Sequence, residues 1–161
     1  MCCKIFVVPE LDKPAGQWCR HFAKGAGCTI HTTRPNLCRV YQCTWSVVDF
    51  LDLAWRPDNA KFVMNSYENE LLIETDPAVP DAWRKEPYYA QIKAWSAREV
   101  RPFRLVIVRS RARITVVFPE DDIDLGPAQA DKQIESGYET RDGKRVPYAY
   151  YKTPTRPLVQ R

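Results

Sequence analysis

Residues 103–118 read FRLVIVRSRARITVVF, which is two apolar runs rich in Val and Ile on either side of a short basic stretch. Such runs are typical of β-strands, because branched side chains pack well on a pleated surface. The basic stretch at residues 109–111 predicts a turn that joins a strand over 103–108 to a second over 114–118. A sheet in the second half of the chain follows from this segment.

Two more hairpins flank that pair along the chain. Residues 61–67 and 71–75 are strand-like and enclose the polar stretch Glu68-Asn69-Glu70. Residues 137–140 and 144–151 enclose Asp142-Gly143, a dipeptide favoured in tight hairpin turns because both positions need left-handed backbone. The sheet is therefore expected to be mainly antiparallel.

One principal helix is expected between the first two hairpins. Pro87 suits a first helical position, and Tyr88, Ile92 and Trp95 recur at the spacing of one helical face. The helix is expected to end near Arg101-Pro102. Residues 119–124 are strongly acidic and are interpreted as a solvated loop. The order of elements predicts an α+β fold.

The first 43 residues have a different character. They contain six Lys or Arg and two acidic residues, a surplus of four positive charges, whereas the remaining 118 residues contain 18 charges of each sign. They also contain every cysteine and both histidines of the chain, namely Cys2, Cys3, Cys19, Cys28, Cys38, Cys43, His21 and His31. Clustered cysteine and histidine indicate a site.

Three interpretations of the cysteines compete. A disulfide framework suits secreted chains, but the sequence shows no secretory signal, and cytosolic thiols stay reduced. Unlinked structural cysteines are expected to be dispersed over both halves. Metal or iron–sulfur ligation explains both the clustering and the charge, since four thiolates around Zn²⁺ leave about −2 at the site. The prolines and glycines between the cysteines predict a loop-rich module with a short helix near residues 37–45.

Several motifs of this segment together resemble one family. They are CCK at 2–4, PELDKP at 9–14, WCRH at 18–21, GCTIH at 27–31 and RPNLCRVYQCTW at 34–45. The chain is similar here to the YkgJ-type cysteine-cluster family, which is described as zinc- or iron-chelating. The similarity covers roughly the first 57 residues and implies metal binding through cysteines, without implying a reaction.

The candidate ligands follow from the cluster and from this resemblance. We expect most of the metal ligands to be Cys3, Cys19, Cys28, Cys38 and Cys43. Cys2 is expected to be either a further ligand or a free thiol, and His21 is a further candidate. The family commonly has tyrosine at the position of His31, and often cysteine at that of Phe22. The sulfurs are expected to converge within about 4 Å of one another, around Zn–S bonds of ~2.3 Å.

The sequence thus predicts a cysteine-cluster metal-binding module over residues 1–57 and an α+β domain of unassigned role over 58–161. The expected cofactor is zinc, as first choice, or an iron–sulfur cluster, in a structural or chelating role. An alternative is a redox or cysteine-chemistry enzyme, indicated by an exposed cysteine of lowered pKa. A zinc-stabilised adaptor for a protein or nucleic acid is a third hypothesis.

Location and partners follow from hydropathy and charge. No apolar run approaches the ~18 residues of a membrane helix, so we expect a cytoplasmic protein without membrane contact. With metal bound, the net charge of the first segment falls to about +2, which is little for neutralising phosphates. We expect no nucleic-acid partner, and a protein partner is left open.

Overall fold

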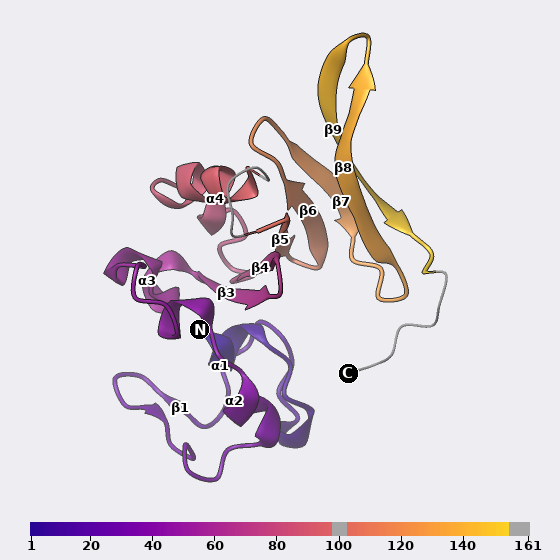
Figure 1. Ribbon diagram of the computed structural model, residues 1–161. Helices are drawn as coiled ribbons and strands as arrows, with labels where there is room; N and C mark the ends of the chain where they lie inside the picture. Colours follow the sequence, from indigo (N-terminus) through magenta and orange to yellow (C-terminus); the bar gives the residue numbers. More distant parts are fainter. Residues whose placement is uncertain (98–102, 155–161) are drawn as a thin grey trace.

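The computed structural model describes residues 1–97 and 103–154 (Figure 1). Its centre is a five-stranded sheet in the order β3-β4-β5-β6-β7, antiparallel except between β4 and β5, which are parallel. The strands are β3 (Phe62–Tyr67), β4 (Glu70–Thr75), β5 (Leu105–Ser110), β6 (Arg113–Val117) and β7 (Asp122–Pro127). The predicted α+β class with a mainly antiparallel sheet is confirmed.

Helix α4 (Tyr88–Ser96) lies between β4 and β5 in the chain and covers one face of the sheet. The short 3-10 helix η4 (Ala82–Arg84) precedes it. Val106 and Val108 of β5 face the core beneath the helix, where Ile92 is fully buried. Pro87 lies immediately before the helix, and the predicted helix end near Arg101-Pro102 lies outside the described residues.

The hairpin of β8 (Gln133–Arg141) and β9 (Lys144–Lys152) packs on the opposite face, next to β7 (Figure 1). Leu105, Val116 and Phe118 are buried beneath it. Asp142 and Gly143 form its turn with φ of 51° and 73°, the left-handed backbone that the Asp-Gly pair predicted. This hairpin is longer than expected because its β8 strand begins before residue 137.

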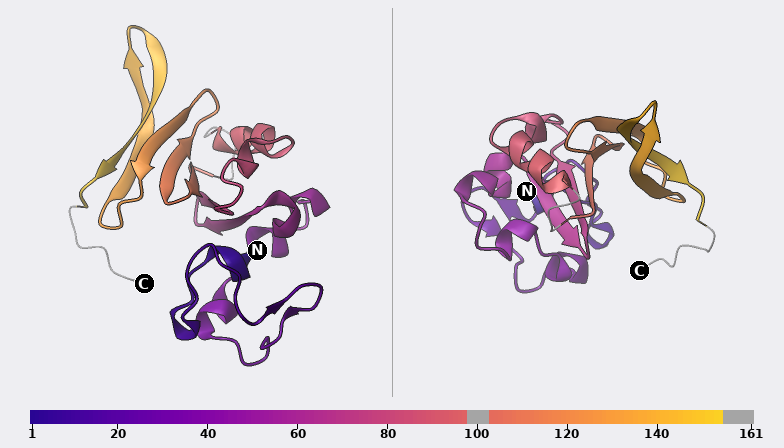
Figure 2. Two further views of the ribbon diagram at one scale, coloured as in Figure 1. Left: turned by 180° about the vertical axis from the view of Figure 1, so that it is seen from behind. Right: turned by 45° about the horizontal axis from the view of Figure 1, so that its top comes forward.

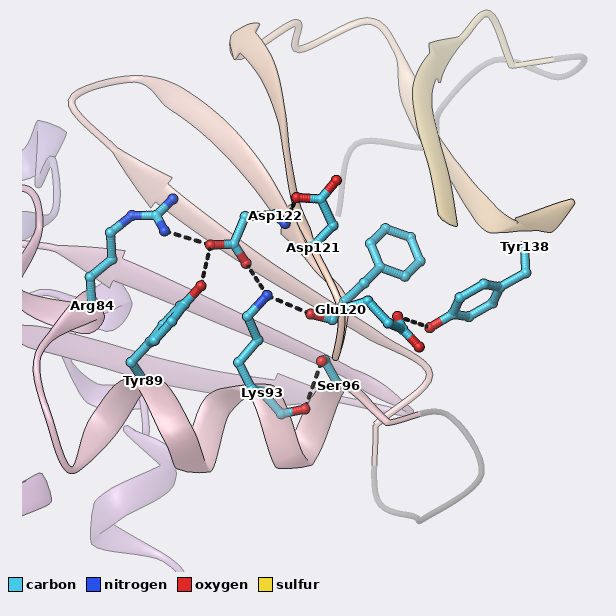
Figure 3. Close-up of polar contacts among 9 residues, drawn as sticks. Arg84, Tyr89, Lys93, Ser96, Glu120, Asp121, Asp122 and Tyr138 are labelled. Atoms are coloured by element: carbon cyan, nitrogen blue, oxygen red, sulfur yellow. Dashed lines mark hydrogen bonds and ion pairs between the residues drawn. The ribbon is translucent and has the colours of Figure 1, made fainter. Parts of the chain in front are cut away.

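The acidic run at residues 119–124 is not simply a solvated loop, since β7 begins at Asp122. The Asp122 carboxylate is buried and is reached from helix α4, as Figure 3 shows. Lys93 Nζ lies 2.8 Å from Oδ1, while Tyr89 donates a 2.9 Å hydrogen bond to Oδ2, which Arg84 also contacts. Lys93 in addition donates to the Phe118 carbonyl at 2.7 Å. Sequence pattern missed this strand because its acidic start looks solvated.

Replacing Asp122 with asparagine should lower the free energy of unfolding by about 2 kcal/mol at pH 7, since two cations lose a buried carboxylate. Burial raises the pKa of Asp122, but hydrogen bonds from Lys93 and Tyr89 outweigh it and hold the pKa below its ordinary value of 3.8. Because the pKa of Asp122 is lower in the folded than in the unfolded protein, its ionised carboxylate stabilises the fold at pH values above the unfolded pKa. This stabilisation is lost as the pH falls through the pKa of the folded protein.

Urea unfolding at several pH values checks this expectation. The difference in the free energy of unfolding between the parent protein and Asp122→Asn should be constant above about pH 5 and should shrink below about pH 4. Asp49→Asn, at an exposed position, is the matched control and should change stability by less than about 0.5 kcal/mol. A pH-independent difference would contradict the ionic origin of the effect.

The first third of the chain consists of short elements joined by loops, as predicted. They are α1 (Cys2–Ile5), η1 (Pro9–Leu11), β1 (Phe22–Ala23), β2 (Gly27–Cys28), α2 (Asn36–Val40), η2 (Thr44–Ser46), η3 (Leu53–Trp55) and α3 (Pro57–Ala60). The short helix expected near residues 37–45 is α2, which ends at Val40.

Throughout the described ranges, no helix is long and apolar enough to span a membrane.

This segment packs against β3, the edge strand of the sheet (Figure 2). Lys4 Nζ lies 2.6 Å from the buried Asp76 carboxylate, and Thr44 donates a 3.4 Å hydrogen bond to Ser66 of β3. Trp55 belongs to the core under α4 and is 6% exposed. The predicted division at residue 57 stays a prediction, but the two parts share packing on both sides of that residue.

Candidate metal centre

Five of the six cysteines line one cavity of about 490 Å³ between the N-terminal segment and the edge strand β3. They come from four separate pieces of chain. The cavity also has apolar walls, one imidazole and one amide from β3. Its lining residues with metal-binding or amide side chains are Cys2, Cys3, Cys19, Cys28, His31, Cys38 and Asn65. Bringing four distant pieces of chain to one cavity gives a thiol-rich site.

Backbone hydrogen bonds hold the first cysteines in place. Cys2 and Cys3 lie on α1, and the Cys19 N–H donates to the Cys3 carbonyl at 2.9 Å. The Cys19 carbonyl accepts the Phe22 N–H at 2.9 Å, where the β1–β2 hairpin begins. Gly27 has a φ of 83°, a left-handed conformation that favours glycine, and it turns the chain so that Cys28 reaches the cavity.

Two arginines position the cysteine on α2. Arg34 donates through Nε to the Cys38 carbonyl at 3.2 Å and through its guanidinium to the His31 carbonyl. Arg39 donates to the carbonyls of Arg34 at 3.0 Å and Thr32 at 2.8 Å. Two residues of the basic surplus therefore hold the loops of this segment through backbone carbonyls.

The thiols influence one another electrostatically. A hydrogen bond from the Cys3 thiol lowers the pKa of Cys2 to about 6. This effect outweighs partial desolvation of the thiol, although Cys2 as a whole is exposed. That same hydrogen bond, together with burial, raises the pKa of Cys3 above the ordinary value of 9.0. Burial raises the pKa of Cys38, and the negative charges of Cys2 and Cys19 raise it further. Ionisation of one thiol therefore disfavours ionisation of its neighbours, and Cys2 is the first of Cys2, Cys3 and Cys38 to ionise as the pH rises.

Alkylation of metal-free protein with iodoacetamide should modify Cys2 first, because the thiolate is the reactive form and Cys2 is exposed. The rate at Cys2 should rise through a midpoint near pH 6, while Cys3 should stay slow below pH 9. Peptide mass spectrometry after timed quenching measures both rates. A Cys2 rate that rises only above pH 8 would contradict the pairing of the two thiols.

The remaining candidates lie elsewhere. Cys43 lies beside Tyr41, a cavity-lining residue whose pKa is raised by burial and then by the negative charge of Cys43. His21 accepts the Thr29 N–H on its carbonyl at 2.9 Å, and the histidine on the cavity wall is His31. His31 belonged to the predicted cluster but was ranked below His21 as a ligand because of the family resemblance, and Asn65 was not indicated by the sequence pattern. For Asn65 no local signal existed, because it reaches the cavity from the sheet.

The fit of a metal to this cavity depends on donor type and on donor geometry. Thiolates suit zinc and iron–sulfur clusters, and five thiols exceed the four that either centre needs. Among residues 1–97 and 103–154, however, no three Cys, His, Asp or Glu side chains form a group that could hold a metal ion as they stand. The expected convergence of the sulfurs is therefore not seen, and ligation requires the thiols to close in on the cavity.

Comparisons of the chain with family models, curated proteins and solved structures found no match. The similarity to the YkgJ-type family stays a prediction that depends on the quoted motifs.

Proposed function

We propose that this protein binds zinc or an iron–sulfur cluster through its N-terminal cysteines, in a structural or chelating role. The observation that carries the proposal is that Cys2, Cys3, Cys19, Cys28 and Cys38 line one cavity although they come from four pieces of chain. Dispersed core cysteines have no reason to share a cavity wall, whereas ligands must.

Four or five of these thiols would hold the centre, with Cys43 as a further candidate at the Tyr41 side. A bound zinc ion or cluster would link four separate pieces of chain through metal–ligand bonds. It would contribute folding free energy to a segment whose helices and strands are short. The chain itself supplies a Cys2 thiolate near neutral pH, so at least one ligand needs no proton removed by the metal.

Metal content tests the proposal. Protein purified anaerobically should retain zinc or iron at one or more equivalents per chain, as measured by plasma mass spectrometry. Iron–sulfur centres absorb visible light and zinc sites do not, so the spectrum separates the two cofactors. Cys28→Ser should lower the metal content strongly, while Thr33→Ala, which removes an exposed hydroxyl outside the cavity lining, should not. Metal-free protein, or equal retention by both variants, would overturn the proposal.

A redox or thiol-chemistry enzyme is the second candidate, and the pairing of Cys2 with Cys3 favours it. Cys2 is exposed and its pKa is about 6, which is the environment of a reactive cysteine. The six cysteines are free in the structure. Saturation with metal should protect at least four of the five cavity thiols from alkylation under the first proposal, and should leave the alkylation of all five unchanged under the second.

The proposed surroundings are those of a reduced compartment. Free, partly ionised thiols persist in the cytoplasm and are oxidised outside it, so we propose a cytoplasmic location. The metal ion is the one partner that the proposal requires, and nucleic acid has no part in it.

A further inference from the structure

A buried ion pair joins the short helix α1 to the sheet. Lys4 Nζ lies 2.6 Å from the Asp76 carboxylate, and the two side chains are only 17% and 6% exposed. The two residues are 72 positions apart in the chain, and Figure 1 shows α1 next to this end of the sheet. A buried charge is costly unless it is paired, so each of these side chains depends on the other.

The carboxylate of this pair is held in place by its own part of the chain. Asp76 directly follows β4, and its N–H donates to the Lys61 carbonyl at 2.8 Å. Its carbonyl accepts the Val79 N–H at 2.8 Å, and its Oδ1 accepts the Ala78 N–H at 3.0 Å. Asp76 is thus fixed at three points and offers its remaining carboxylate oxygen, Oδ2, to Lys4.

The lysine of this pair belongs to the helix that carries two of the cavity thiols. Lys4 follows Cys3 on α1, and both Cys2 and Cys3 line the cavity. The Cys3 carbonyl accepts the Cys19 N–H at 2.9 Å, so the position of α1 also sets the backbone at Cys19. A helix of four residues is not stable without tertiary contacts. Three of the five cavity thiols therefore depend on where Lys4 is held.

We infer that the Lys4–Asp76 ion pair positions α1 and its thiols for metal binding, so that the sheet serves as the scaffold of the metal site. The inference rests on the proposed function, because it concerns the ligands of that same site. The thiols have to close in on the cavity to bind a metal, and an anchored helix loses less conformational entropy in that step than a free one. Both residues act through the backbone of α1 and are positioning residues.

The zinc affinity of Asp76→Asn tests the inference. Asparagine retains an acceptor for the Ala78 N–H and removes the charge that holds Lys4. Anaerobic competition with a chromophoric chelator should show Zn²⁺ binding weakened about 10-fold, the lower end of the cost of losing a group that orients metal ligands. Asp122→Asn is the matched control, because Asp122 is also a buried carboxylate, 2.8 Å from Lys93, but does not line the cavity. Its Zn²⁺ affinity should stay within about twofold of the parent protein.

A double-mutant cycle shows whether the two residues act as a pair. Lys4→Met removes the positive charge, keeps a side chain of similar length, and should weaken Zn²⁺ binding by a similar factor. The double variant Lys4→Met/Asp76→Asn should lose no more than the larger of the two single losses, because the first substitution already breaks the contact. Losses that multiply in the double variant, unchanged affinity in either single variant, or an equal loss in Asp122→Asn would overturn the inference.

Hydrogen exchange of the metal-free protein supplies a readout that needs no zinc. Asp76→Asn should speed exchange of residues 2–8 several-fold, since two N–H groups of α1 donate to the Met1 carbonyl at 2.8 and 3.0 Å only while the helix stays in place. Asp122→Asn should leave this segment unchanged. If the parent protein binds no zinc or cluster, the proposed function fails and the inference fails with it. Zinc binding by the parent, with exchange and affinity both unchanged in Asp76→Asn, would overturn the inference alone.

Discussion

Replacing Cys38 with serine should release the metal and remove the structure of residues 1–43, while the sheet of β4, β5 and β6 keeps its protection. A serine hydroxyl is a poor ligand for zinc or iron, so affinity should fall further than the about 10- to 100-fold cost of changing a supporting group. The N-terminal segment has little regular structure, and a bound metal would supply much of its folding free energy. Hydrogen exchange read by mass spectrometry measures the effect segment by segment.

Contacts across the two parts limit how local the loss can be. The edge strand β3 should lose part of its protection, because Asn65 and Ser66 contact the N-terminal segment directly. Cys43→Ser is the comparison variant and should have a smaller effect, since Cys43 contacts Tyr41 and is not part of the cavity wall. Uniform loss of protection through β4–β6 in Cys38→Ser would mean that the two parts fold as a single unit.

Replacing Trp55 with alanine should lower the free energy of unfolding by about 4 kcal/mol, the cost of deleting a large buried aromatic side chain. Trp55 is 6% exposed and packs edge-on against Phe62 and Tyr88, with ring centroids 6.1 and 5.1 Å away. The ring of Trp95 on α4 is also in contact with Trp55, with a distance of 4.9 Å between the ring centroids. The residue thus joins the end of the first segment to the helix and to the sheet.

Phe50→Ala is the matched control, because Phe50 is a large aromatic residue of the same segment with 70% exposure. Its removal should change stability by less than about 0.5 kcal/mol. Chemical unfolding followed by circular dichroism measures both variants. A loss below about 1 kcal/mol for Trp55→Ala would show that the segment around residue 55 does not belong to the core of the sheet.

The sheet could be predicted to the extent that apolar runs and turn residues mark it. Val106, Val108 and Ile114 lie in strands that the β-branched pattern indicates, and Asp142-Gly143 forms its turn with the expected backbone. Strand β7 could not be predicted, because its first residue, Asp122, is held in place by Lys93, which lies 29 residues earlier in the chain. Local pattern carries no information about such a partner.

In the candidate site, too, the local sequence predicted some features, while others depend on residues that are distant in the chain. Clustering and order of the cysteines indicated that they act together, and five of them do line one cavity. The contribution of Asn65 depends on how the chain returns through space, since nothing in the local sequence shows that this strand residue reaches the cysteine cavity. The choice of His21 over His31 depended on the family resemblance, whereas His31 is the one on the cavity wall.

X-ray absorption at the metal edge tests most directly whether thiolates of this cavity hold a metal. Protein purified anaerobically and loaded with its own metal should give three or four sulfur scatterers at about 2.3 Å. A first shell made only of nitrogen and oxygen at about 2.0–2.2 Å would contradict the account.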